Sequence, residues 1–409
     1  MTLVMEETAV PTEAPIAGTI APAIAALTAA EMYETILDGS APFILDVRNE
    51  DDFERWRVEG RAGLNILNLP YFEFVEDEEA SLHTLARHVS TEEEILVVCA
   101  KEGSAQFVAE ILRDAGYSVS YLKEGITSWG DLYDVRDVVS GAYGRIIQIA
   151  RPARGDLSFV LISDGQAAIV DPLRHIDYYL DAISEAGASL THIFDTHAHA
   201  DHISGGPALK AATGASYYMH PYDAIHPLDM LPATISYTYL HDGQTFQVGQ
   251  MTVKTIWFPG HTLGQVNYLA TTPDGGRYLF TGDGIFLQSF GRPDLGGQGE
   301  RWTPILYESM FHRLPPHLTD NTYILPAHFS RQDEDGGNGI FVETYATVKT
   351  QNEALKPRTL AEFTDYVLSS LPHFPQEYVE IKRVNAGLSH PDEEAASELE
   401  LGKNICALA

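Results

Sequence analysis

The chain has 409 residues, of which 44% are hydrophobic and 10% aromatic. That length exceeds what one ordinary core supports, so we expect a packed globular protein of two domains. A formal net charge of −32 argues against binding to nucleic acid or anionic lipid, which requires lysine and arginine patches. The sequence contains only two cysteines, Cys99 and Cys406, and no apolar run that could span a bilayer. Two thiols do not make a disulfide scaffold, so we expect a cytoplasmic protein.

The N-terminal part of the chain divides into a leader and a first domain. Residues 1–24 are rich in alanine, proline and threonine and lack the basic stretch of a signal peptide, so we expect a disordered leader. Residues 25–136 alternate buried strands with amphipathic helices, a pattern that predicts a parallel α/β sheet. The expected strands are 43–47, 94–99 and 118–122, and the expected helices are 51–58 and 104–115.

From about residue 140 the strands follow one another more closely, and we expect a second domain over residues 140–409. The change of pattern places a linker at about residues 134–143. The glycine-rich segment 333–339 is expected to be a loop. The strands expected in this domain are 158–163, 167–170, 251–258, 277–280 and 322–325.

Four apolar strands of the second domain each stop at side chains that can bind a metal. Neighbouring strand ends lie on one rim of a sheet and hold several ligands in a fixed geometry, so this pattern predicts a metal site. The four segments read THIFDTHAHADH (191–202), TIWFPGH (255–261), YLFTGD (278–283) and YILPAH (323–328). Their metal-binding residues are His197, His199, Asp201, His202, His261, Asp283 and His328.

These motifs resemble the metallo-β-lactamase superfamily over the chain from about Gly141 onward, which implies an αββα sandwich with the site at one edge. The segment DGIFLQSFGRPDL (283–295) resembles more closely the persulfide dioxygenases, in which two histidines and one aspartate hold a single Fe(II). That resemblance implies one Fe(II) per chain, bound by His197, His261 and Asp283. It also implies that His199, Asp201, His202 and His328 are hydrogen-bond partners around the site or ligands of a second metal.

The reaction implied by the dioxygenase resemblance is oxidation of a low-molecular-weight persulfide by O₂. Two imidazoles and one carboxylate leave open positions on Fe(II) for the substrate sulfur and for O₂. The product would be a sulfinic-type R–S–SO₂ species, which hydrolyses to thiol and sulfite. All seven residues of a dinuclear zinc hydrolase such as glyoxalase II are also present, so a Zn-dependent thioester hydrolase is the alternative.

Two features of the second domain concern the carrier thiol, which is the thiol RSH whose sulfur bears the extra sulfur atom of the persulfide. Arg292 either contacts a carboxylate of that thiol or pairs with Asp294 or another acidic residue. Phe329-Ser330 stand where many persulfide dioxygenases have Asp-Tyr, which leaves the identity of the carrier thiol open.

Cys99 ends a buried strand and precedes a loop and a helix. Backbone N–H groups and the helix dipole at such a position stabilise a thiolate or persulfide anion. The sequence over about 27–135 resembles a rhodanese, through Asp-Val-Arg at 46–48 and Lys-Glu-Gly-Ile at 123–126 with Trp129. The resemblance implies a rhodanese-like domain in which Cys99 is the nucleophile that carries sulfane sulfur.

The loop after Cys99 departs from the usual rhodanese form. Lys101, Gly103 and Ser104 are the expected anion-binding residues, but Gly103 comes one place late and Glu102 lies inside the loop. The acidic side chain opposes a dianion, so we expect thiosulfate to be a poorer substrate than a low-molecular-weight persulfide.

Taken together, these patterns predict a persulfide dioxygenase with a sulfurtransferase domain. Its expected partners are a low-molecular-weight persulfide, O₂, and sulfite or thiosulfate, and we expect a homo-oligomer. Sulfur could pass between the domains in either direction, by thiosulfate formation or by persulfide supply. A persulfide carrier or sensor that uses Cys99 is a third hypothesis. Cys406, after an acidic stretch near the C-terminus, is either a sulfur shuttle or an inert surface thiol.

Overall fold

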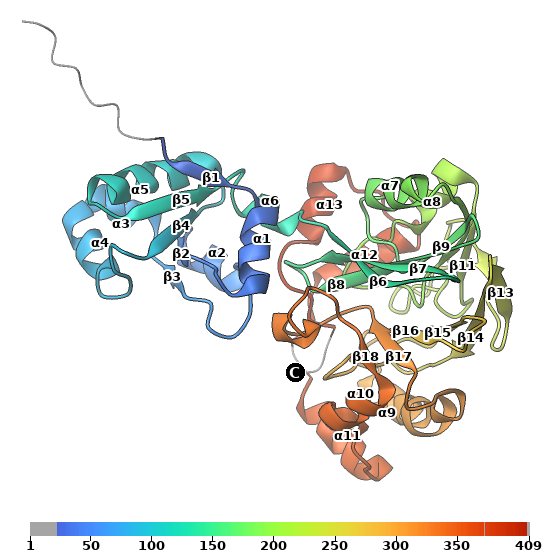
Figure 1. The fold of residues 1–409 in the computed structure, drawn as a ribbon. Coiled ribbons are helices and arrows are strands. Elements are labelled where there is room, and N and C mark those ends of the chain that lie inside the picture. Colours follow the sequence, from blue (N-terminus) through green and yellow to red (C-terminus); the bar gives the residue numbers. More distant parts are fainter. Residues whose placement is uncertain (1–22, 372, 407–409) are drawn as a thin grey trace, which may run out of the picture.

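The structure is a computed structural model that describes residues 23–371 and 373–406 (Figure 1). The expected leader falls almost entirely on residues 1–22, outside the described part. The first sheet has the strand order β1-β5-β4-β2-β3, and every neighbouring pair in it is parallel. This confirms the predicted parallel α/β sheet. Its strands are β1 (Ala25–Leu27), β2 (Phe43–Asp46), β3 (Ile66–Asn68), β4 (Glu94–Val98) and β5 (Ser118–Leu122).

Helices cover both faces of this sheet because alternate side chains of a strand point to opposite faces. In β4, Ile95 and Val97 pack into one apolar cluster with helix α5, whereas Leu96 and Val98 pack into another with helix α1. Cys99 belongs to the α5 side. The helices are α1 (Ala29–Asp38), α2 (Glu50–Arg55), α3 (Tyr71–Glu76), α4 (Glu78–Leu85), α5 (Glu102–Asp114) and α6 (Ile126–Gly130).

The second part of the chain contains two further sheets that face each other. One has the order β12-β11-β10-β9-β8-β7-β6, and the other has the order β13-β14-β15-β16-β17-β18. The first consists of β6 (Asp134–Gly141), β7 (Gly144–Arg151), β8 (Asp156–Ser163), β9 (Gln166–Val170), β10 (Ser189–Phe194), β11 (Ser216–Met219) and β12 (Thr238–Tyr239). The second consists of β13 (Thr245–Val248), β14 (Met251–Trp257), β15 (Val266–Thr271), β16 (Arg277–Gly282), β17 (Tyr323–Pro326) and β18 (Glu343–Thr344).

A shared apolar core fills the space between the two sheets, with Phe159 and Leu161 from one and Tyr268 and Phe280 from the other. Helices cover the outer faces, which completes the predicted αββα sandwich (Figure 1). The helices are α7 (Asp177–Glu185), α8 (Gly206–Thr213), α9 (Gly299–Glu308), α10 (Tyr345–Gln351), α11 (Leu360–Ser369), α12 (Glu377–Asn385) and α13 (Glu393–Leu399). Short helical turns lie at Ser309–Arg313, Pro315–His317, Gln332–Asp335 and Glu353–Leu355.

The prediction of a linker at residues 134–143 is wrong, because most of that segment is strand β6. Its residues pair antiparallel with β7, from Asp134 opposite Ala150 to Gly141 opposite Gly144. Its sequence, DVRDVVSG, places valines among polar residues as an edge strand does, so the change of pattern at this point marks a strand and not a connection. The rhodanese-like sheet therefore leads into the sandwich without a long free segment.

Polar and apolar contacts join the two parts. Arg61 donates to both carboxylate oxygens of Asp335 at 2.7 Å, and Lys403 pairs with Glu59 at 2.5 Å. Leu401 packs on the same apolar cluster as α1 and α6. Among the described residues, no helix is long and apolar enough to cross a membrane.

Candidate metal centre

Three strand ends bring His197, His261 and Asp283 together. His197 follows β10, His261 follows β14 and Asp283 follows β16, and all three side chains are fully buried. The Nε2 atoms of His261 and His197 lie 3.3 and 3.9 Å from Asp283 Oδ2. Within the described part of the chain, these donor atoms have no hydrogen-bond partner. Buried polar atoms without partners are rare and costly, so the three residues form a site that fits a metal cation.

The other ring nitrogens of the two histidines are held by neighbouring groups. Nδ1 of His197 lies 3.0 Å from the Thr196 hydroxyl, and Nδ1 of His261 donates to the main-chain oxygen of Arg292 at 2.8 Å. These contacts turn each Nε2 toward Asp283. Burial lowers the pKa of both imidazoles, and the adjacent histidines lower that of His197 further. A histidine with a low pKa is neutral at pH 7, which is the form that binds a metal.

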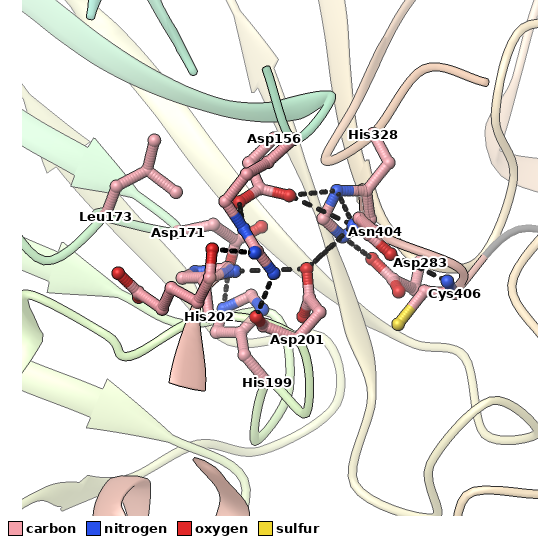
Figure 2. A network of polar contacts seen from close by, with 12 residues as sticks. Asp156, Asp171, Leu173, His199, Asp201, His202, Asp283, His328, Asn404 and Cys406 are labelled. Atoms are coloured by element: carbon pink, nitrogen blue, oxygen red, sulfur yellow. Dashed lines mark hydrogen bonds and ion pairs between the residues drawn. The ribbon is translucent and has the colours of Figure 1, made fainter. Parts of the chain in front are cut away.

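The remaining predicted side chains lie beside this trio, so the structure brings all seven together. Figure 2 shows five of them, namely His199, Asp201, His202, Asp283 and His328. His199, Asp201 and His202 form a second buried group, and His328 Nε2 lies 3.2 Å from Asp201 Oδ2 and 3.0 Å from Asp283 Oδ1. In the described residues, four buried atoms of this group have no hydrogen-bond partner: His199 Nδ1, Asp201 Oδ1, His202 Nε2 and His328 Nε2.

Two acidic residues that sequence reasoning missed surround His199. Its Nε2 lies 3.1 Å from Asp171 and 3.9 Å from Asp195. Burial opposes a charged imidazole, but these carboxylates outweigh it and raise the pKa of His199 to about 9. Asp171 directly follows β9 and Asp195 directly follows β10. Both therefore carry the strand-end signal that identified the other seven residues.

The C-terminal segment, residues 400–406, runs into the centre (Figure 2). Asn404 Nδ2 lies 2.7 Å from Asp201 Oδ2 and 2.6 Å from His328 Nδ1. Cys406 is fully buried beside Tyr378, so its interpretation as a surface thiol is wrong. The acidic stretch before it is not a loose tail, because it forms α13 and ends at Glu400, which pairs with buried arginines.

Arg292 makes the structural contact with Asp294 that was one of its two expected roles. Its Nε and Nη2 donate to the two carboxylate oxygens of Asp294 at 2.7 and 2.9 Å, and the residue is fully buried. The pairing with Asp294 is therefore confirmed, and a contact of Arg292 with the carrier thiol stays a prediction. Through its main-chain oxygen, the residue also orients His261.

A cavity of about 640 Å³ opens beside the trio. Its wall includes Ala198 and Thr262, which directly follow His197 and His261, and Lys382 from α12. Lys382 Nζ donates to the main-chain oxygen of Ala198 at 2.6 Å, and burial lowers the pKa of this ammonium. Sequence reasoning missed Lys382, which carries no local signal. Tyr222, Leu263, Leu295, Arg301, Trp302 and Ile305 also line the cavity.

Asp223 ties together the two loops that carry His197 and His261. Its carboxylate accepts from the main-chain N–H of Ala198 at 2.9 Å, from the Thr262 hydroxyl at 2.7 Å and from Gly264 N–H at 2.8 Å. One buried side chain therefore fixes the spacing between the two histidines.

Cys99 lies at the carboxyl end of β4 and is 8% exposed. Its main-chain oxygen accepts from Ile126 N–H at 2.8 Å, which ties it to the start of α6. Helix α5 begins at Glu102, two residues before the predicted start. Gly103 and Ser104 therefore both lie in its first turn. Lys101 precedes that turn. The predicted anion-binding residues therefore follow the thiol closely in sequence and lie at the N-terminus of a helix.

Comparison with known proteins agrees with this architecture. The family model described as metallo-beta-lactamase superfamily matches residues 152–331, and that described as rhodanese-like domain matches residues 28–132. A hydroxyacylglutathione hydrolase of Rhodospirillum rubrum is 30% identical over 196 residues, which cover 48% of this chain and 67% of that protein. The chain belongs to the metallo-β-lactamase superfamily. A rhodanese-like domain precedes the superfamily domain.

Two further members of the superfamily resemble this chain. A hydroxyacylglutathione hydrolase of Brucella ovis is 32% identical over 209 residues, which cover 50% of this chain and 72% of that protein. The crystal structure of a metallo-beta-lactamase from Staphylococcus aureus subsp. aureus COL is 25% identical, with a TM-score of 0.54. That likeness covers 61% of this chain and 74% of the other.

Proposed function

We propose that the protein oxidises a low-molecular-weight persulfide with O₂ at a single Fe(II) held by His197, His261 and Asp283. The observation that carries the proposal is the convergence of two neutral imidazoles and one carboxylate, each with a buried unpartnered donor atom. The iron supplies open coordination positions for sulfur and O₂. The balanced reaction converts RSSH, O₂ and H₂O into RSH, sulfite and two protons.

The cavity beside the trio supports a role for this chain in binding the carrier thiol. Ala198 and Thr262 place its wall next to two of the ligands, so a persulfide in the cavity directs its outer sulfur to the centre. Lys382 and Arg301 supply positive charge that attracts a carboxylate of the thiol. Trp302 contributes apolar wall that keeps water away from the reacting atoms.

The rhodanese-like domain supports a second step on the sulfite product. A persulfide on Cys99 is electrophilic at its outer sulfur, and sulfite is a nucleophile. Attack by sulfite forms the new S–S bond of thiosulfate, breaks the bond between the two sulfurs on Cys99 and leaves the Cys99 thiolate. The start of α5, with Gly103 and Ser104 in its first turn, favours that anion.

A zinc-dependent thioester hydrolase is the second candidate. It is favoured by the unpartnered atoms His199 Nδ1, Asp201 Oδ1 and His202 Nε2, which could hold another metal. The curated relatives named hydroxyacylglutathione hydrolase point the same way. This candidate requires two metals, whereas the dioxygenase requires one.

Metal content after anaerobic purification, combined with O₂ uptake on glutathione persulfide, separates the two candidates. We expect about one iron per chain and stoichiometric O₂ uptake. His261→Ala should lose iron and O₂ uptake together, while His241→Ala, which changes an exposed histidine, should keep both. Two zinc ions per chain with thioester turnover and no O₂ uptake would contradict the proposal.

A further inference from the structure

The cavity beside the trio has a mainly apolar wall. The wall is built by the segment between β11 and β12, by the loop after His261, by the loop before helix α9 and by that helix itself. The burial of an apolar group is favourable in proportion to the area that it removes from water, so such a wall binds an apolar body well. Its main apolar side chains are Ile225, Met230, Leu263, Leu295, Trp302 and Ile305.

The charged side chains of this wall are few, and two of them already have partners. The carboxylate of Asp223 accepts three hydrogen bonds from groups of the two ligand loops, and Lys382 Nζ donates to the main-chain oxygen of Ala198 at 2.6 Å. Arg301, the third charged residue of the wall, is exposed. The wall therefore offers a basic group on its exposed side, while an ammonium group inside the cavity would compete with the donors that Asp223 already binds.

The apolar surface continues outside the cavity along the segment between β11 and β12. Tyr222 and Met230 line the cavity and are 57% and 70% exposed, and Leu228 and Leu231 of the same segment are exposed as well. Contiguous exposed apolar side chains commonly mark a binding surface. A thiol that is longer than the cavity can therefore keep apolar contacts beyond the mouth.

These features discriminate between classes of carrier thiol. Glutathione carries two carboxylates and one ammonium group, and all three lose water when they enter an apolar cavity with few free partners. We propose that the cavity selects the persulfide of a thiol with an extended, mainly apolar body over that of a small, multiply charged thiol such as glutathione. The inference rests on the proposed function and adds to it the chemical class of the carrier thiol.

A homologous series of uncharged thiols tests the inference. N-butanoyl-, N-hexanoyl- and N-octanoylcysteamine share the sulfur end and differ only in the number of methylene groups. Calorimetry measures the binding of each thiol, and of glutathione, to the iron-loaded protein in the absence of O₂. O₂ uptake is then measured with the persulfides of the same four thiols.

We expect the dissociation constant to fall by up to about 4-fold for each added methylene, and glutathione to bind more weakly than the octanoyl thiol. The value of kcat/KM for O₂ uptake should follow the same order. Ile305→Asp and Met230→Asp place a charge in the wall and should weaken binding of the octanoyl thiol about 10-fold or more. Leu360→Asp is the matched control, because Leu360 is 43% exposed and is not part of the cavity wall.

The variant at Met230 decides if Ile305→Asp does not fold. Met230 is exposed and has a φ of 55°, a conformation that aspartate adopts readily. Dissociation constants that do not depend on chain length would overturn the inference, and so would tighter binding of glutathione or a chain-length effect that both cavity variants leave unchanged. The proposed function would still stand if persulfides drive O₂ uptake. No O₂ uptake with any persulfide would contradict the proposed function, and thiol binding, measured without turnover, would still decide the inference.

Discussion

Glu400 is a buried carboxylate whose contribution to stability can be worked out from its contacts. Its Oε2 lies 2.7 Å from Arg151 Nη1 and 2.9 Å from Arg174 Nε, and its Oε1 accepts from Ile203 N–H at 2.7 Å. Burial alone would raise the pKa of Glu400, but Arg151, Arg174 and Arg154 outweigh burial and lower the pKa to about 2. The charged carboxylate therefore stabilises the folded chain.

The size of this contribution follows from the two pKa values. The ordinary value is 4.5 and the folded value is about 2, which corresponds to about 3 kcal/mol of unfolding free energy at pH 7. Because the pKa is lower in the folded protein, this stabilisation is present above pH 4.5 and is lost as the pH falls toward 2. Glu400→Gln should therefore reduce the free energy of unfolding by about 3 kcal/mol at pH 7 and by about 1 kcal/mol at pH 3.

Urea unfolding at pH 7 and pH 3 measures this difference, with tryptophan fluorescence as the signal. Trp56 reports on the rhodanese-like domain and Trp257 on the sandwich. The matched control is Glu393→Gln, because Glu393 also pairs with Arg174 but its side chain is 77% exposed. Exposed pairs contribute about 0–1 kcal/mol. Equal effects of the two substitutions at pH 7, or a Glu400 effect that does not shrink at pH 3, would refute the reasoning.

Two further predictions concern the thiol and the metal ligands. Cys99→Ser should lose the single sulfur that mass spectrometry detects after incubation with a persulfide donor, and should make sulfite rather than thiosulfate from persulfide and O₂. Sulfurtransferase activity at the wild-type level in that variant would rule out the role of Cys99. Asp223→Ala should weaken iron binding about 10- to 100-fold in a chelator competition, because it frees the loops of His197 and His261. An unchanged affinity for iron would show that the contacts of Asp223 are not needed to hold the two loops.

The sequence predicts most of the metal centre because its ligands obey a local rule. Each ligand strand is apolar, and a histidine or an aspartate follows within four residues of its end, at the rim of the sheet. The same rule, applied to the strand that ends at Val170, would also have identified Asp171. Asn404 and Lys382 could not be found in this way. They reach the centre from segments far along the chain, and neither interrupts a strand or a periodic pattern.

The errors have a common physical origin in long-range contacts. Segment 134–143 looks like a connection when taken alone, and becomes a strand only because β7 offers it a partner. Cys406 follows an acidic stretch that looks solvent-exposed, yet Arg151 and Arg174 neutralise Glu400 and draw the segment inward.

The C-terminal segment also sets a limit on how far the two domains can move apart. Leu401 packs against the apolar cluster of α1 and α6 in the rhodanese-like domain, and Asn404 contacts His328 in the metal centre. The three residue steps between Leu401 and Asn404 reach at most about 10 Å when fully extended. A larger displacement of the rhodanese-like domain must pull Leu401 from its cluster or Asn404 from His328. The tether thus couples a movement of the rhodanese-like domain to the side chains that Asn404 contacts in the metal centre.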